Sequence, residues 1–216
     1  MEYSQDDTVH SSDLSESTDS NYSNTLKLIL LGDTGVGKSS LINVSVGNQF
    51  SNIVPSTVAS SVVPIKFYKG NRQYILNIWD TAGQEKFRAM TKLFVKNAKI
   101  VIFVYAINNK SSFESLKFWV SIVKEALGDE PILALVGNKS DLYVNEQISE
   151  KIGSNYAKEI GAKFTLASAK CNAKGFINFL EQLLDEYLQI KGINLTTSFE
   201  IKKEKHKKKN AKKKCC

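Results

Sequence analysis

Four short segments of the chain combine glycine, lysine, aspartate and hydroxyl residues at spacings that suit phosphate chemistry. The first, GDTGVGKS at 32–39, follows an apolar run and precedes a helical pattern. In that setting glycines let backbone N–H groups turn toward phosphate oxygens, and the helix N-terminus favours anions. We expect Lys38 to reach the β- and γ-phosphates of a nucleotide and the Ser39 hydroxyl to bind Mg²⁺. A glycine-rich turn without a ligand is the alternative, which the combination of strand, helix, lysine and serine disfavours.

The second segment, WDTAGQ at 79–84, places Asp80 at the end of a predicted strand. A carboxylate there suits Mg²⁺, and the backbone N–H of Gly83 suits a contact to a γ-phosphate. Gln84 would orient the attacking water. An isolated Asp-x-x-Gly segment is most simply a turn, but downstream of a phosphate-binding loop it predicts phosphoryl-transfer chemistry.

The third and fourth segments could recognise a base. Asn138, Lys139 and Asp141 follow another predicted strand. The carboxylate of Asp141 can accept hydrogen bonds from guanine N1–H and the exocyclic amine, a pair that adenine lacks, so the segment indicates GTP rather than ATP. The stem of Lys139 would cover the ring. Ser168-Ala169-Lys170, at 168–170, would offer a backbone N–H to guanine O6, although an ordinary loop explains this tripeptide equally well.

Strands and helices must position these segments, and the hydrophobic pattern predicts both. Short apolar runs indicate strands, and apolar residues spaced three and four apart indicate helices, with Phe113 and Trp119 expected in the core. Pro64 removes a backbone donor, so its strand is predicted at a sheet edge. The fold class is therefore α/β, a six-stranded, mostly parallel sheet flanked by helices, whose ligands bind beyond the carboxyl ends of the strands. The predicted strands are 26–31, 62–68, 74–79, 100–107, 132–136 and 163–167, and the predicted helices are 38–47, 111–127, 147–160 and 174–190.

The two ends of the chain differ from its centre in composition. The chain has 216 residues and a net charge of +7, which comes largely from nine lysines within 202–214, whereas residues 1–26 carry six acidic residues and no lysine or arginine. We therefore predict a disordered, Ser/Asp-rich extension over 1–24, one domain over 25–190 and a flexible polybasic tail over 191–216. We expect no signal peptide and no membrane-spanning helix, and the three cysteines suit a reducing compartment.

Residues outside the four segments show which known proteins the chain resembles. The second segment begins with Trp79 and is followed by Phe87 and Arg88, and the chain ends in Cys215 and Cys216. With the four segments, these residues resemble the Rab family of the Ras-superfamily small GTPases over residues 25–190. The resemblance implies the P-loop small-GTPase fold and an enzyme that converts GTP and water to GDP and phosphate.

The resemblance also assigns roles that the residues alone do not. It implies that the Thr57 hydroxyl reaches Mg²⁺ while its N–H reaches the γ-phosphate, and that Phe50 stacks on guanine. Read locally, Thr57 is as well explained as a loop residue and Phe50 as a core residue. The implied catalytic residue is Gln84, and the implied metal ligands are Ser39, Thr57 and Asp80. The implied nucleotide-binding residues are Asp33, Thr34, Gly35, Val36, Gly37, Lys38, Ser39, Ser40, Phe50, Thr57, Gly83, Asn138, Lys139, Asp141, Ser168, Ala169 and Lys170.

Some residues depart from the common Rab pattern. Ala59 stands where the family usually has glycine, and Val62 stands where it often has an aromatic residue. Segments 57–61, 127–130 and 160–163 resemble instead the early-endosomal Rab branch. The resemblance thus implies a molecular switch that regulates vesicle traffic, in the endocytic and early endosomal system, in the cytosol and on the cytoplasmic face of endosomal membranes.

The C-terminal residues imply lipidation and partners. In Rabs a Cys-Cys end such as Cys215-Cys216 implies two geranylgeranyl groups, and two chains with a polybasic tail suffice for stable membrane attachment. The implied partners are an exchange factor, a GTPase-activating protein, effectors, a prenylation escort protein and a dissociation inhibitor. We expect a monomer that does not bind nucleic acid.

Two alternatives remain open. One is a GTP-bound membrane scaffold with negligible intrinsic hydrolysis; Gln84 argues against it, whereas Thr34 and Ala59 keep it open because Thr34 is bulkier than glycine beside the γ-phosphate. The other is an RNA-binding NTPase that uses the lysine tail, against which the terminal cysteines argue.

Overall fold

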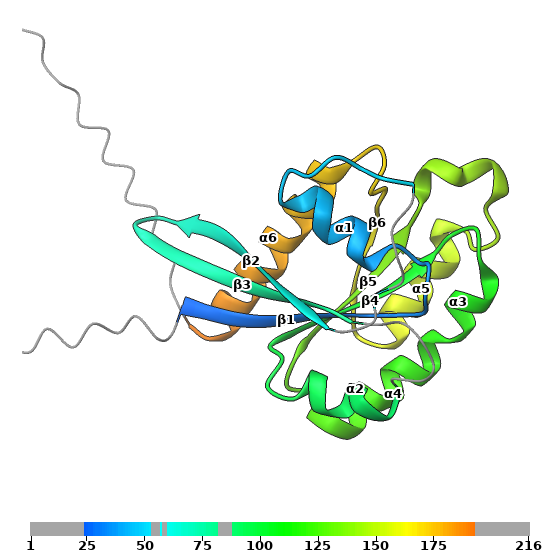
Figure 1. Ribbon diagram of the computed structural model, residues 1–216. Helices are drawn as coiled ribbons and strands as arrows, with labels where there is room; N and C mark the ends of the chain where they lie inside the picture. The colour runs from blue at the N-terminus through cyan, green and yellow to red at the C-terminus, as the bar shows by residue number, and fades with distance from the viewer. Residues whose placement is uncertain (1–23, 53–56, 58–59, 82–87, 193–216) are drawn as a thin grey trace, which may run out of the picture.

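The computed structural model describes residues 24–52, 57, 60–81 and 88–192, which form a sheet covered by helices on both faces (Figure 1). The strand order is β2-β3-β1-β4-β5-β6. The β2–β3 pair is antiparallel and every other pair is parallel. The predicted fold class is confirmed, including the edge position of the strand with Pro64. The strands are β1 Thr25–Leu31, β2 Ser61–Lys69, β3 Arg72–Asp80, β4 Ile100–Ala106, β5 Ile132–Asn138 and β6 Lys163–Leu166.

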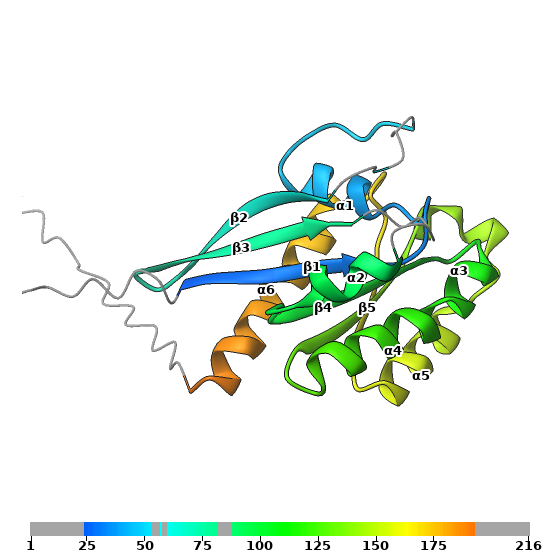
Figure 2. The same cartoon turned by 60° about the horizontal axis from the view of Figure 1, so that its bottom comes forward.

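Helices lie on both faces of the sheet. Helices α1 and α6 lie on one face, and α2, α4 and α5 lie on the other (Figures 1 and 2). Within the described part of the chain, no helix has the length and apolar character needed to cross a membrane. The helices are α1 Lys38–Ser45, α2 Arg88–Val95, α3 Lys110–Glu114, α4 Leu116–Leu127, α5 Glu150–Glu159 and α6 Ala173–Ile190, with a 3₁₀ segment η3 at Ser140–Asn145.

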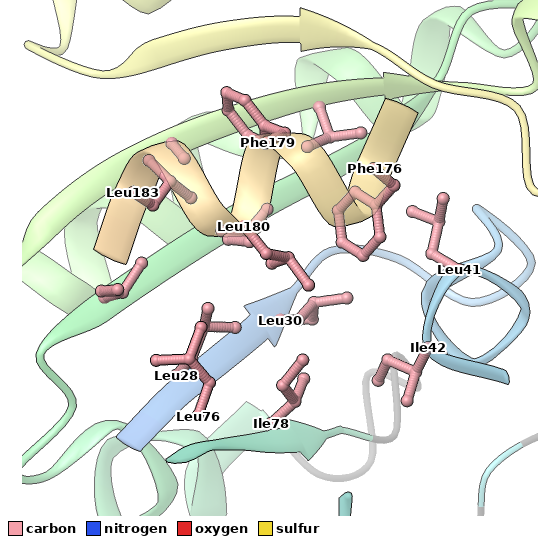
Figure 3. Close-up of a cluster of buried hydrophobic side chains, with 14 of the residues drawn as sticks. Leu28, Leu30, Leu41, Ile42, Leu76, Ile78, Phe176, Phe179, Leu180 and Leu183 are labelled. Carbon is pink, nitrogen blue, oxygen red and sulfur yellow. The ribbon is translucent and has the colours of Figure 1, made fainter. Parts of the chain in front are cut away.

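The sheet separates two apolar cores because successive side chains of a strand point to opposite faces. In β1, Leu28 and Leu30 belong to one cluster and Ile29 and Leu31 to the other. All seven residues of β4 are buried, as expected for a central parallel strand that is covered on both faces. Figure 3 shows the first cluster, where residues of β1 and β3 pack against α1 and α6: Leu28, Leu30, Leu76, Ile78, Leu41, Ile42, Phe176, Phe179, Leu180 and Leu183.

The predicted helix 111–127 is wrong in one respect, because α3 and α4 are separate and Ser115 lies between them. The Ser111 carbonyl accepts hydrogen bonds from both the backbone N–H and the hydroxyl of Ser115, each at 3.0 Å. A serine hydroxyl that competes for a helical carbonyl in this way weakens the regular ladder. The predicted core position of Trp119 is confirmed, since it is 1% exposed, and Phe113 packs partly buried against the same cluster.

Other predicted boundaries differ by a few residues. The helix predicted from 147 begins at Glu150, because the side chain of Gln147 accepts from the Lys110 N–H and Ser149 is extended. Helix α6 begins at Ala173, where the side chain of Asn172 accepts from the Gly175 N–H at 2.8 Å. Helix α2 had no counterpart among the predicted helices. The predictions for 1–24 and 191–216 lie almost wholly outside the described residues, of which only Asn24, Lys191 and Gly192 fall in these ranges.

Candidate functional site

A cavity of about 370 Å³ opens at the carboxyl ends of β1, β3 and β5. This is the edge at which parallel α/β sheets bind ligands. The cavity draws its walls from loops that are far apart in sequence, and its polar lining suits a phosphorylated ligand. The lining residues are Thr34, Gly35, Gly37, Lys38, Ser39, Ser40, Phe50, Ser51, Asn52, Thr57, Thr81, Asn138, Lys139, Asp141, Leu142, Ala169 and Lys170.

The loop between β1 and α1 depends on glycines at two positions. Gly32 has φ +147°, and a Cβ there would overlap the carbonyl oxygen of Val104 on β4. Gly37, at the N-cap of α1, has φ +95°, and its Cβ would overlap the side-chain amide of Asn138. No side chain caps this helix. The first N–H groups of α1 are therefore not occupied by a capping side chain, which is the arrangement that binds anions.

Lys38 lies inside this loop with its ammonium group held by backbone oxygens. Lys38 is 5% exposed, and its Nζ donates to the carbonyls of Gly32 at 2.7 Å and Asp33 at 2.9 Å. Burial lowers the pKa of Lys38 to about 8, although the carboxylates of Asp80 and Asp33 act in the opposite direction. A buried cation with neutral partners gains from a nearby anion, so Lys38 is suited to bind phosphate.

Three oxygen-bearing side chains meet beside the loop. The Ser39 hydroxyl donates to Asp80 Oδ2 at 2.5 Å and lies 3.0 Å from the hydroxyl of Thr57. Burial raises the pKa of Asp80, against the lowering effects of its hydrogen bond with Ser39 and the charge of Lys38. Asp80 Oδ1 is buried and has no hydrogen-bond partner among the described residues. A carboxylate and two hydroxyls are hard oxygen ligands, so these residues fit Mg²⁺.

The base-reading segments are joined to the phosphate loop by one buried amide. Asn138, 1% exposed, donates from Nδ2 to the Val36 carbonyl at 2.8 Å and accepts at Oδ1 from the Ala169 N–H at 3.4 Å. It thereby connects the loops after β1, β5 and β6. Lys139 adopts the left-handed conformation with φ +63°, which turns the chain from β5 toward the cavity.

The Asp141 carboxylate is held in place by a buried serine. Its Oδ1 accepts from the Ser168 hydroxyl at 2.6 Å, and Ser168 Oγ in turn accepts from the Cys171 N–H at 3.0 Å. Ser168 is 2% exposed, so it orients Asp141 rather than lining the cavity. An oriented carboxylate discriminates between bases more strongly than a mobile one, because it is already in position to accept two hydrogens.

Most predicted nucleotide-binding residues border this one cavity, including Phe50 and Thr57, but three do not. Val36 lies in the core, Ser168 lies beneath Asp141, and the Asp33 side chain points to the indole of Trp119. Gly83, Gln84, Cys215 and Cys216 lie outside the described residues. Sequence reasoning missed Ser51, Asn52, Thr81 and Leu142, whose only signal is adjacency to predicted positions.

A mostly parallel sheet whose first loop and helix N-terminus surround a buried lysine defines the class of phosphate-loop nucleotide-binding domains. Residues 27–189 match the model of the Ras family. The chain is also 36% identical over 163 residues to "Ras-related protein Rab-21" from Geodia cydonium, a match that covers 74% of this chain and 71% of that protein. The chain belongs to the Ras family of small GTPases, in its Rab group, and it is therefore a GTP-binding switch that hydrolyses GTP.

Proposed function

We propose that this GTPase controls vesicle traffic in the endocytic and early endosomal system, and that the cavity at the carboxyl edge of the sheet is its nucleotide site. The observation that supports the site best is the convergence of Lys38, Ser39, Thr57 and Asp141 on one cavity, with the Asp80 carboxylate bonded to the Ser39 hydroxyl at its edge. The two halves of the cavity complement the two ends of a guanine nucleotide, the phosphates and the base. One half offers a cation and backbone N–H groups, and the other offers an oriented carboxylate.

The protein's contribution to hydrolysis is positioning and charge. Lys38 and the backbone of 33–39 hold the phosphates, and Ser39, Thr57 and Asp80 hold Mg²⁺, which when bound neutralises developing charge on the phosphate oxygens. Gln84, outside the described residues, positions the attacking water in this proposal. Phe50, Asn138, Lys139, Asp141, Ala169 and Lys170 hold the guanine ring.

In this proposal, the change between the GTP-bound and GDP-bound states depends on Thr57. Its hydroxyl lies 3.0 Å from that of Ser39, so the loop that carries Thr57 reaches the proposed metal ligands. Loss of the γ-phosphate would remove a contact that holds this loop, and a partner that recognises the ordered loop would dissociate. We propose an exchange factor, an activating protein that supplies an arginine, and effectors as such partners.

Membrane attachment is proposed from the tail, which lies outside the described residues. Geranylgeranylation of Cys215 and Cys216, assisted by an escort protein, would anchor the chain with its polybasic segment on an anionic cytoplasmic leaflet. A dissociation inhibitor would extract the lipidated chain from the membrane. Endosomal placement is supported by the resemblance of segments 57–61, 127–130 and 160–163 to the early-endosomal Rab branch.

Single-turnover GTP hydrolysis by the full chain with Mg²⁺, beside Gln84→Leu, tests the site. We expect measurable turnover in the parent and at least about a tenfold loss in the variant, because water positioning is removed while binding is kept. Asp141→Ala is the matched binding control. It should lower the affinity for GTP and reduce the preference for GTP over ATP. Tight GTP binding without turnover in parent and variant, even with an activating protein, would instead indicate a scaffold.

A further inference from the structure

The second residue of the phosphate loop, Asp33, points away from the cavity that its neighbours line. Thr34 and Gly35 border the cavity and Asp33 does not. The Asp33 Oδ1 accepts a hydrogen bond from Trp119 Nε1 at 3.0 Å, and Trp119 belongs to α4, 86 residues further along the chain. Trp119 is 1% exposed, so the indole N–H is delivered to the loop from the core.

The direction of the Asp33 carboxylate affects phosphate binding because the backbone carbonyl of the same residue contacts Lys38. The Asp33 backbone carbonyl is 2.9 Å from Lys38 Nζ, the group proposed to hold the phosphates. A carboxylate that turned into the cavity would place a negative charge beside a negatively charged ligand. It would also compete with phosphate for Lys38. A hydrogen bond to a charged acceptor is strong enough to prevent that turn.

We propose that Trp119 is a positioning residue for nucleotide binding, whose indole N–H holds the Asp33 carboxylate out of the phosphate subsite. This inference rests on the proposed nucleotide site. Packing alone is the competing explanation, since Trp119 is among the largest buried side chains. The two explanations differ in one respect: packing affects every ligand equally, whereas a freed carboxylate acts against phosphate charge.

The test measures the affinities of the full chain for GTP, GDP and GMP, by competition against a fluorescent GDP analogue. We expect Trp119→Phe to weaken GTP and GDP binding by about tenfold, with a smaller effect on GMP. In the Asp33→Asn chain, the same Trp119→Phe change should have no further effect, because the freed side chain carries no charge. Val123→Ala, a fully buried position one turn along α4, is the matched packing control and should leave the ratio of GTP to GMP affinity unchanged.

A second measurement does not depend on Trp119→Phe folding. The chain has two tryptophans, so Trp79→Phe leaves Trp119 as the only indole. We expect Asp33→Ala in that chain to change the emission maximum of Trp119. An unchanged maximum would overturn the inference, as would equal losses for all three nucleotides or a persistent loss in the Asp33→Asn chain. A parent chain that binds no GDP would instead overturn the proposed site itself.

Discussion

Two lysines, at opposite ends of the sheet, are both largely buried but have different partners. Lys38 lies in the phosphate loop, where its ammonium group donates to the backbone carbonyls of Gly32 and Asp33, and burial lowers its pKa to about 8. The Lys69 side chain, 12% exposed, lies where β2 ends, and it bonds to Glu181 at 2.7 Å and Asp185 at 2.9 Å on α6.

The difference separates a binding lysine from a structural one. Burial acts to lower the pKa of Lys69, but its hydrogen bonds to Asp185 and Glu181 outweigh burial, and the pKa is raised. Its charge is thus satisfied within the fold. Lys38 has no carboxylate in direct contact among its described hydrogen bonds, so its charge is available to an anionic ligand.

The largest effect is expected from Lys38→Met, which removes the charge and keeps much of the apolar stem. We expect GDP affinity to fall at least about 100-fold, or about 2.7 kcal/mol, because charge-assisted bonds to phosphate are lost. Titration calorimetry measures the change. Lys69→Met is the matched control, and its affinity should stay within about twofold because the two sites are distant. Equal losses in both variants would remove the contrast.

A smaller effect is expected on stability from Lys69→Met. It leaves two carboxylates on α6 without their shared cation, so we expect the free energy of unfolding to fall by about 1–2 kcal/mol. Denaturant unfolding of the GDP-bound chain measures this. Lys66→Met, at an exposed lysine of the same strand, should stay within about 0.5 kcal/mol. A similar loss at both positions would show that the α6 contacts contribute nothing specific.

The pH dependence of that stabilisation has a definite sign. Because the folded pKa of Lys69 is raised above 10.5, its contribution is complete below 10.5 and is lost as pH rises through the folded pKa. The stability difference between parent and Lys69→Met should therefore be constant from neutral pH to about pH 10 and shrink above it. Denaturant unfolding of both chains, measured at several pH values across this range, gives that difference. A difference that grows with pH would contradict the assignment.

The smallest effect is expected inside the cavity, at Thr34. This exposed residue borders the site of the phosphates and is bulkier than glycine. We expect Thr34→Gly to raise the single-turnover rate of GTP hydrolysis by a few-fold, on the order of 1 kcal/mol in the barrier. GDP affinity, measured in parallel, should change less than the rate. Equal rates for parent and variant would dispose of the hypothesis.

Much of the architecture was predictable because it depends on local patterns. Apolar runs predicted all six strands, and Pro64 predicted the edge, since both signals come from residues adjacent in the chain. Boundaries were less predictable. Ser115 interrupts the helix through a hydrogen bond to Ser111, and helix α2, which has the same eight-residue length as the predicted α1, was missed.

The sequence by itself determined the chemistry of the site: which residues are cations, carboxylates and hydroxyls, and that they follow strands whose carboxyl ends share one edge. Only the tertiary structure decided which way those groups point. Ser168 lies beneath Asp141 and Trp119 turns Asp33 away from the cavity. Such contacts join residues whose separation along the chain carries no pattern, and they exist only because the packing of the helices on the sheet brings them within hydrogen-bonding distance.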